Sequence, residues 1–239
     1  MTPLTFYEQV GILIPGAVLL FAVTLLQPEW KAILGGNGLT IGGLGLFLLL
    51  SYAAGHAVAA VGNIIEKLLW AVFGGLPTDR LARNPEKVLG QKRLARFKEL
   101  FQKRYQYDAP ISELEPDGPP KRWTKLWWSR RKAWRSAFGQ LYSDVRVNNP
   151  GTVLTFNGNY GLNRGLAASM MVITLLICTL RPQGFVQTAV AAGLLTIVFL
   201  FRTYRFGIYF AREVFNNFLN LEFAKVTNTE SAKDGTPSK

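Results

Sequence analysis

The residues with the clearest chemical potential in this 239-residue chain are polar side chains spaced along one apolar stretch. Spacings of four, seven and three residues place Tyr52, His56, Asn63 and Glu66 on one face of a helix. The pKa of a free histidine side chain lies near 6.5, so His56 is a candidate titratable gate in a polar pore or proton path. The alternative is a packing network of hydrogen bonds between helices, helped by neighbouring small residues. In either case His56 and Asn63 are expected to face the bundle interior or an oligomer axis.

Glu66 is the last residue on this polar face, and an ionisable group within or near the bilayer needs a partner of opposite charge. Arg164, at the start of a later apolar stretch, is the candidate charge partner. An intramembrane enzyme would need Glu66, Arg164 and His56 in one polar cavity. The sequence contains no phosphate-binding loop, nucleophile elbow or histidine-rich metal motif, and it has one His and one Cys. We therefore expect no catalytic residue, no metal and no cofactor.

A second group of residues combines positive charge with aromatic rings between residues 74 and 150. This segment holds 17 of the 27 Lys and Arg residues but 8 of the 15 Asp and Glu residues, a net charge of +9. Such a composition suits an anionic membrane surface, and it can also neutralise phosphate and stack bases. Solvated helix faces and docking of a protein partner are the alternatives. The candidate contacts to the membrane surface, or to an anion such as a nucleotide or nucleic acid, are Arg93, Arg96, Lys103, Arg104, Trp127, Arg130, Arg131, Lys132 and Arg135.

Four apolar stretches must position these side chains, at about residues 10–26, 39–65, 165–180 and 185–201. Each approaches or exceeds the roughly 20 residues with which a helix crosses a bilayer. Short connections, such as Arg181-Pro182-Gln183-Gly184, join the stretches in pairs. The predicted fold is therefore all-α: an integral membrane protein with four transmembrane helices in two hairpins and a small helical cytoplasmic layer. Pro15-Gly16 predicts a kink in the first helix.

The chain is thus expected to have four segments. Residues 1–73 form the first hairpin, with its second helix extended, and residues 74–150 form the basic amphipathic insert. Residues 151–223 form the second hairpin with a helical extension, and the polar residues 224–239 are predicted to be disordered. Helical periodicity predicts two insert helices, at 85–105 and 121–145, packed against the extensions of the second and fourth helices. The glycines at 158–165 are expected to let the chain turn into the third helix.

The distribution of Lys and Arg predicts the orientation, because cytoplasmic loops carry an excess of these residues. The two short connections hold only Lys31 and Arg181, whereas the insert is strongly basic. The insert and both termini are therefore expected in the cytoplasm. The first ten residues carry Glu8 and no Lys or Arg, so we expect no cleavable signal peptide.

Three short motifs lie in or beside the apolar stretches: Pro15-Gly16, Ser51-Tyr52-Ala-Ala-Gly55-His56 and Tyr160-Gly-Leu-Asn-Arg164-Gly165. They resemble features of uncharacterised bacterial four-span inner-membrane proteins, some of which accompany phage-defence genes. The resemblance implies a multi-pass protein of the bacterial inner membrane and an effector that perturbs membranes. It supplies no functional residues.

Together these features predict a non-enzymatic, oligomeric membrane protein that acts as an effector, pore or sensor in phage defence. Its expected partners are the lipid bilayer, further copies of the chain, and a cytoplasmic protein or a nucleotide or nucleic-acid ligand at the basic layer. One alternative is a membrane anchor or scaffold that recruits a cytoplasmic protein through residues 74–150. The other is an intramembrane enzyme.

Overall fold

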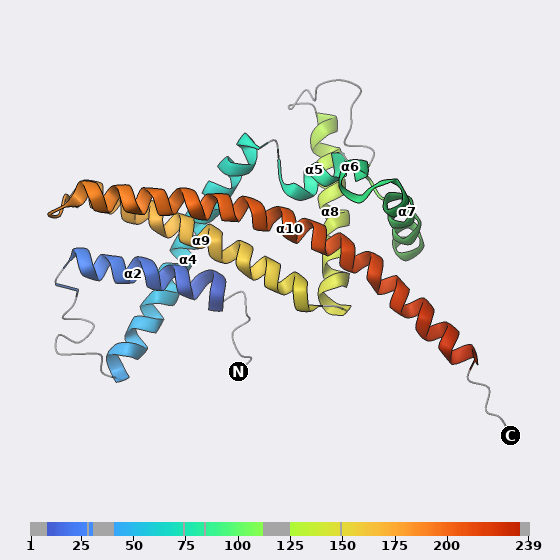
Figure 1. The fold of residues 1–239 in the computed structure, drawn as a ribbon, viewed down its shortest axis with the longest axis horizontal. Coiled ribbons are helices and arrows are strands. Elements are labelled where there is room, and N and C mark those ends of the chain that lie inside the picture. The colour runs from blue at the N-terminus through green and yellow to red at the C-terminus, as the bar shows by residue number, and fades with distance from the viewer. Residues whose placement is uncertain are drawn as a thin grey trace. The chain divides into compact units, whose positions relative to one another are not determined.

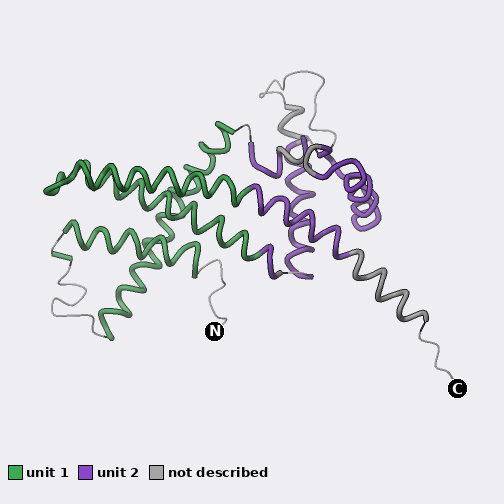
Figure 2. The backbone as a smooth tube through the Cα atoms, in the orientation of Figure 1, with its two compact units in different colours: residues 1–73, 154–207 green, residues 74–153, 208–239 purple. Residues whose placement is uncertain are grey.

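The computed structural model describes residues 9–27, 29–30, 41–73, 75–83, 85–111, 125–148 and 150–234. Nearly all of these residues are helical and none of them lies in a strand, which confirms the predicted all-α class for this part of the chain. The chain divides into two compact units, shown in Figure 2. Unit 1 comprises Met1–Phe73 and Leu154–Gly207, and unit 2 comprises Gly74–Val153 and Ile208–Lys239. Both predicted hairpin segments thus contribute to unit 1.

Unit 1 is built from a π-helical turn, η1 (Gln9–Leu13), α2 (Ile14–Leu26), α4 (Ile41–Val72) and parts of α9 (Pro150–Leu180) and α10 (Phe185–Asp234) (Figure 1). The π turn ends at Leu13, two residues before Pro15, whose ring and missing N–H disturb the regular bonding of the preceding helical turn. Among the described residues, η1 with α2, α4, α9 and α10 supply four helices long and apolar enough to cross a membrane.

Glycines set the close approach of α2, α4 and α9. A Cβ atom at Gly16 of α2 would lie 1.9 Å from the carbonyl oxygen of Ser51 in α4. A Cβ atom at Gly165 of α9 would lie 2.5 Å from Cγ of Pro15. The Ser169 hydroxyl donates to the Pro15 carbonyl oxygen at 2.8 Å, so α9 satisfies a backbone acceptor of α2. The backbones of these helices are therefore in direct contact.

The prediction that residues 158–165 form a turn is wrong, because α9 runs without a break from Pro150. Gly158, Gly161 and Gly165 are all buried inside this helix. Small residues at a helix contact compensate for low helix propensity by allowing close packing. The turn predicted between the last two apolar stretches is present at residues 181–184, where Arg181 (φ 47°) and Gly184 (φ 70°) adopt left-handed conformations.

Unit 2 contains α5 (Pro77–Arg83), α6 (Pro85–Leu89), α7 (Gln91–Tyr105) and α8 (Lys125–Asn148), together with the end of α10. The single helix predicted at 85–105 is divided at Gly90, which has a φ of 74° and ends α6. The helix predicted at 121–145 corresponds to α8, and residues 121–124 lie outside the described part. Helix α5 was not predicted from the sequence.

The core of unit 2 joins the insert to α10. Phe97 of α7 lies 5.0 Å from Phe215 and 5.5 Å from Phe218 of α10, measured between ring centroids. Trp134 of α8 stacks on Phe215 at 6.1 Å, and all four side chains are buried. The predicted packing of the insert on the extension of the last helix is therefore present. The extension of α4, also expected to pack there, belongs to unit 1.

The last helix is longer than predicted. Disorder was expected from residue 224, but α10 continues to Asp234. Five of residues 224–234 are Ala, Glu or Lys, which favour helix, and the first Gly and Pro after residue 221 come at 235 and 237. Residues 235–239 lie outside the described part.

Candidate functional site

Glu66, the last residue of the predicted polar face on α4, belongs to a polar network with α9. The Arg164 guanidinium donates to the Glu66 carboxylate, and the two side chains are only 14% and 20% exposed. The charge partner predicted for Glu66 is therefore in contact with it. The Tyr160 hydroxyl accepts a hydrogen bond from Nε1 of Trp70 at 2.9 Å. Gly62 leaves space for Arg164, whose Cγ would lie 3.4 Å from a Cβ at that position.

A second polar contact joins α9 to α10. Nε of Arg202 donates to Oδ1 of Asn163 at 2.9 Å, and Asn163 is 2% exposed. Asn163 and Tyr160 were not predicted as site residues, because their segment was interpreted as a turn. The available signal was the spacing of Tyr160, Asn163 and Arg164, which continues the helical period into the apolar part of α9. These contacts satisfy polar groups between apolar helices, so Glu66 and Arg164 are explained by packing.

Two other residues of the predicted polar face, His56 and Asn63, have a different environment. His56 and Asn63 are exposed, and they lie on one face of α4 with exposed Ala60 and Lys67. The Tyr52 ring meets the His56 ring edge-on, with centroids 4.7 Å apart. Two orientations were predicted for His56 and Asn63, toward the bundle interior or toward an oligomer axis. Within a single chain they do not face the interior.

The residues needed by an intramembrane enzyme do not converge. Glu66 and Arg164 are in contact, but His56 lies ten residues from Glu66 on the same continuous helix, about 15 Å along its axis. In the part of the chain that the structure describes, no three His, Cys, Asp or Glu side chains are grouped so that they could hold a metal ion.

Several arginines predicted to contact an anion are instead paired inside unit 2. Nη2 of Arg131 lies 2.7 Å from Oδ2 of Asp79, a carboxylate that is 3% exposed, and Arg135 reaches the same oxygen at 4.0 Å. Nε of Arg104 lies 3.0 Å from Oδ2 of Asp144. These pairs join α5 to α8 and α7 to α8. Arg131 in particular has a structural role.

Asp144 also accepts a hydrogen bond from a tyrosine. The Tyr105 hydroxyl donates to Oδ2 of Asp144 at 2.7 Å. Burial raises the pKa of the Tyr105 phenol above its ordinary value, and the hydrogen bond to Asp144 raises this pKa further. Lys103 and Lys132 are exposed. The side chains of Trp127 and Arg130, on α8, lie outside the described part.

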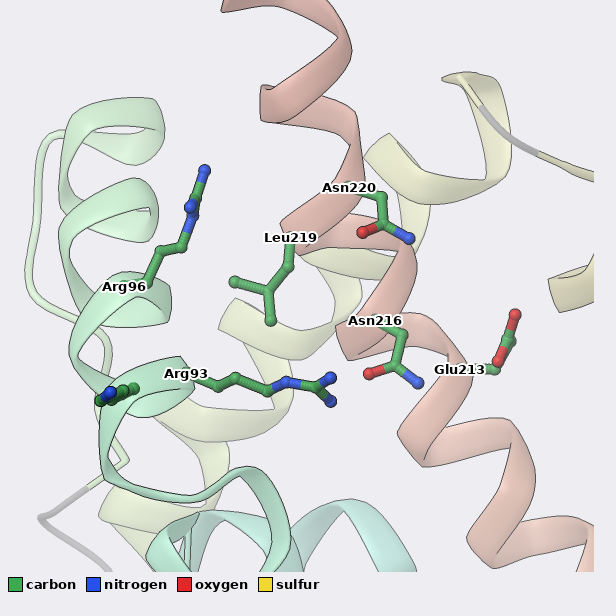
Figure 3. A pocket seen from close by; sticks show the side chains of 7 residues that line it. Arg93, Arg96, Glu213, Asn216, Leu219 and Asn220 are labelled. Carbon is green, nitrogen blue, oxygen red and sulfur yellow. The ribbon is translucent and has the colours of Figure 1, made fainter.

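Arg93 and Arg96 are the predicted anion contacts that line a pocket. Its volume is about 670 Å³, and α7 and α10 form its walls. Figure 3 shows Arg93 extending from α7 toward Asn216 on α10, with Leu219 between the two helices. The lining residues are Lys92, Arg93, Arg96, Glu213, Asn216, Leu219 and Asn220.

No protein-family model, no curated protein and no solved structure matches this chain. Two features of the molecule itself bear on its function: the exposed polar face of α4 and the cationic pocket of unit 2.

Proposed function

We propose that this chain is a non-enzymatic, oligomeric protein of the bacterial inner membrane that acts as an effector by opening a polar path through the bilayer. In this proposal α2, α4, α9 and α10 cross the membrane in two hairpins, and the basic unit 2 and both termini lie in the cytoplasm. Unit 2 binds the partner or anionic ligand that controls the effector. The motifs that resemble proteins accompanying phage-defence genes support a role in such defence.

The observation that carries the proposal is the exposure of His56 and Asn63 on an apolar helix. Polar side chains that face lipid lose their hydrogen bonds to water, which is unfavourable by several kcal/mol in apolar surroundings. Exposed Ala53, Ala57 and Ala60 surround His56 along α4 and would allow another helix to approach closely. A second copy of α4 would cover this face, and His56 and Asn63 would then line the path between subunits.

The remaining surface of unit 1 supports residence in a bilayer. Large exposed apolar side chains are frequent on α4 and α10, including Leu49, Ile64, Val190, Leu194 and Ile197. With 32 residues α4 is about 48 Å long, against roughly 30 Å of hydrocarbon. Figure 1 shows α4 running obliquely to α2, and a tilted helix accommodates such excess length.

Flux through proteoliposomes tests the effector. The full-length protein should release a small trapped cation, and His56→Leu should reduce this release because it removes the polar group from the path. Gln187→Leu, an equivalent change at an exposed position of α10, is the matched control and should leave release unchanged. Absence of flux under every ligand condition would contradict the effector and favour an anchor that recruits a cytoplasmic protein.

Cross-linking tests the proposed interface independently of flux. In a Cys178→Ser background, Ala60→Cys should form an intermolecular disulfide in membranes under oxidising conditions, because Ala60 lies on the proposed contact face. Val190→Cys, at an exposed position of α10, should not. Cross-linking at Val190 but not at Ala60 would place the interface elsewhere and overturn the assignment of the α4 face.

A further inference from the structure

The pocket of unit 2 lies beside a well-packed core and shares Leu219 with it. Leu94, Phe97 and Phe101 turn one face of α7 into that core and are at most 6% exposed. Phe215 and Phe218 fix α10 against the same face of α7. The position of the pocket is therefore set by rigid packing of the two helices that form its walls.

The wall contributed by α7 is cationic. Lys92, Arg93 and Arg96 occur within five residues, so their spacings of three and four place them on one side of the helix. Arginine presents a planar set of donors that matches the oxygens of a phosphate group. Figure 3 shows the Arg93 guanidinium reaching into the space between α7 and α10.

The wall contributed by α10 supplies polar groups of a different kind. Asn216 and Asn220, four residues apart, each offer an amide donor and an amide acceptor. Oε1 of Glu213 already accepts from the Thr152 hydroxyl at 2.8 Å and from Nδ2 of Asn217 at 2.9 Å. These two donors hold the carboxylate in place. The lining residues thus contain three cations and one carboxylate, so the pocket favours an anionic ligand such as a phosphate monoester.

The volume of the pocket further restricts the class of ligand that it can bind. A volume of about 670 Å³ falls within the range of small-molecule sites and far exceeds the needs of a bare phosphate group. Leu219, 6% exposed, provides an apolar surface, and Glu213 can accept a hydrogen bond from a hydroxyl or amino group. We propose that this pocket binds a phosphate-bearing small molecule of nucleotide size, with Arg93 and Arg96 on the phosphate and Asn216, Asn220 and Glu213 on the organic portion.

A soluble nucleotide and a lipid headgroup present the same phosphate chemistry, so the test includes both. ATP binding is measured by calorimetry on the full-length protein in phosphatidylcholine nanodiscs. Retention of phosphatidic acid is measured by native mass spectrometry on the same protein. Saturable ATP binding identifies a soluble source, and selective retention of phosphatidic acid identifies a lipid source.

Variants separate the site from general attraction to a basic protein. Arg93→Ala should weaken binding of the retained probe about 10- to 100-fold, because it removes charge-assisted hydrogen bonds to phosphate. Arg93→Lys should recover only part of the affinity, since it keeps the charge but loses the two-pronged geometry. Arg146→Ala removes the same charge from an exposed position of α8 outside the pocket and should leave affinity unchanged.

Two results would overturn the proposal: neither probe binds in a way that depends on Arg93 below about 1 mM, or Arg146→Ala weakens binding as much as Arg93→Ala does. This proposal names the class of the anionic ligand in the proposed function, and it rests on that function. Because binding is measured without flux, failure to bind leaves the proteoliposome result intact, and absence of flux leaves the binding result intact.

Discussion

Replacing Gly55 by alanine should disrupt the contact of the continuous η1–α2 segment with α4, because the residue opposite Gly55 is Ile12 of η1. A Cβ atom at Gly55 would lie 2.2 Å from the carbonyl oxygen of Ile12 and 2.9 Å from its carbonyl carbon. The obstacle is backbone, which cannot rotate away as a flexible side chain can. The reciprocal contact is equally tight, because a Cβ at Gly16 would meet the backbone of Ser51 at 1.9 Å. Relief therefore requires the two helices to separate.

The expected size of the effect follows from these distances. The added methyl group at Gly55 would be more than about 1 Å inside an ordinary van der Waals separation. Overpacking a close contact costs about 1–3 kcal/mol, and a backbone obstacle favours the upper end of this range. For a protein of this size, about 3 kcal/mol corresponds to a midpoint of thermal unfolding lower by roughly 6–12 °C.

Thermal unfolding of the detergent-solubilised protein, followed by circular dichroism, measures this change. The matched control is Gly45→Ala in the same helix, where an added Cβ would have no neighbour within 4 Å. That substitution should raise stability by about 0.5–1 kcal/mol, because alanine favours helix over glycine. If Gly55→Ala and Gly45→Ala unfolded at the same temperature, the close contact of α2 and α4 would be refuted.

Two further predictions concern unit 2. Asp79→Ala removes the carboxylate that Arg131 contacts at 2.7 Å in a largely buried position, so urea unfolding should show a loss of about 3 kcal/mol, whereas Asp108→Ala, at an exposed position, should show little change. The raised pKa of Tyr105 means that the unfolded chain releases this phenolic proton first, so stability should fall as the pH rises above about 10. Tyr105→Phe should remove part of that fall, and an absorbance titration in which Tyr105 ionises at its ordinary pKa would contradict the assignment.

The apolar helices were predictable because their signal is local. Long stretches free of charge specify length and hydrophobicity. The predicted stretch 10–26 is covered by η1 with α2, the stretches 165–180 and 185–201 lie within α9 and α10, and α4 contains residues 41–65 of the remaining stretch. Helix ends were less predictable. Gly90 divides a continuous amphipathic pattern, and its left-handed conformation is compatible with glycine but is not required by the pattern.

The glycine-rich start of α9 shows why local signals fail at helix contacts. Gly158, Gly161 and two asparagines in eight residues are typical of a turn when read alone. The structure uses the small residues for close packing instead, and Gly165 meets the ring of Pro15 from a helix about 150 residues away in sequence. A single sequence contains no information on which distant surface a glycine must accommodate.

The same limit applies to the charged residues. Spacing alone assigned Arg93, Arg104 and Arg131 to one class of candidate anion contacts. Arg131 and Asp79 are 52 residues apart, and Arg104 and Asp144 are 40 apart, so only the fold shows that these arginines have carboxylate partners. Arg93 projects into a pocket instead. Tertiary partners, rather than residue type, identify Arg104 and Arg131 as structural cations.

The two candidate sites arise in the same physical way. In α7, the residues Leu94, Phe97 and Phe101 occupy the core, and the adjoining side presents cations to the pocket beside α10. In α4, close packing at Gly55 and the Glu66 ion pair take one side, which leaves His56 exposed. A polar group whose contacts within the chain satisfy it is explained by stability. The polar surfaces left exposed by apolar packing are therefore where we propose that a ligand binds unit 2 and that a second copy of α4 packs.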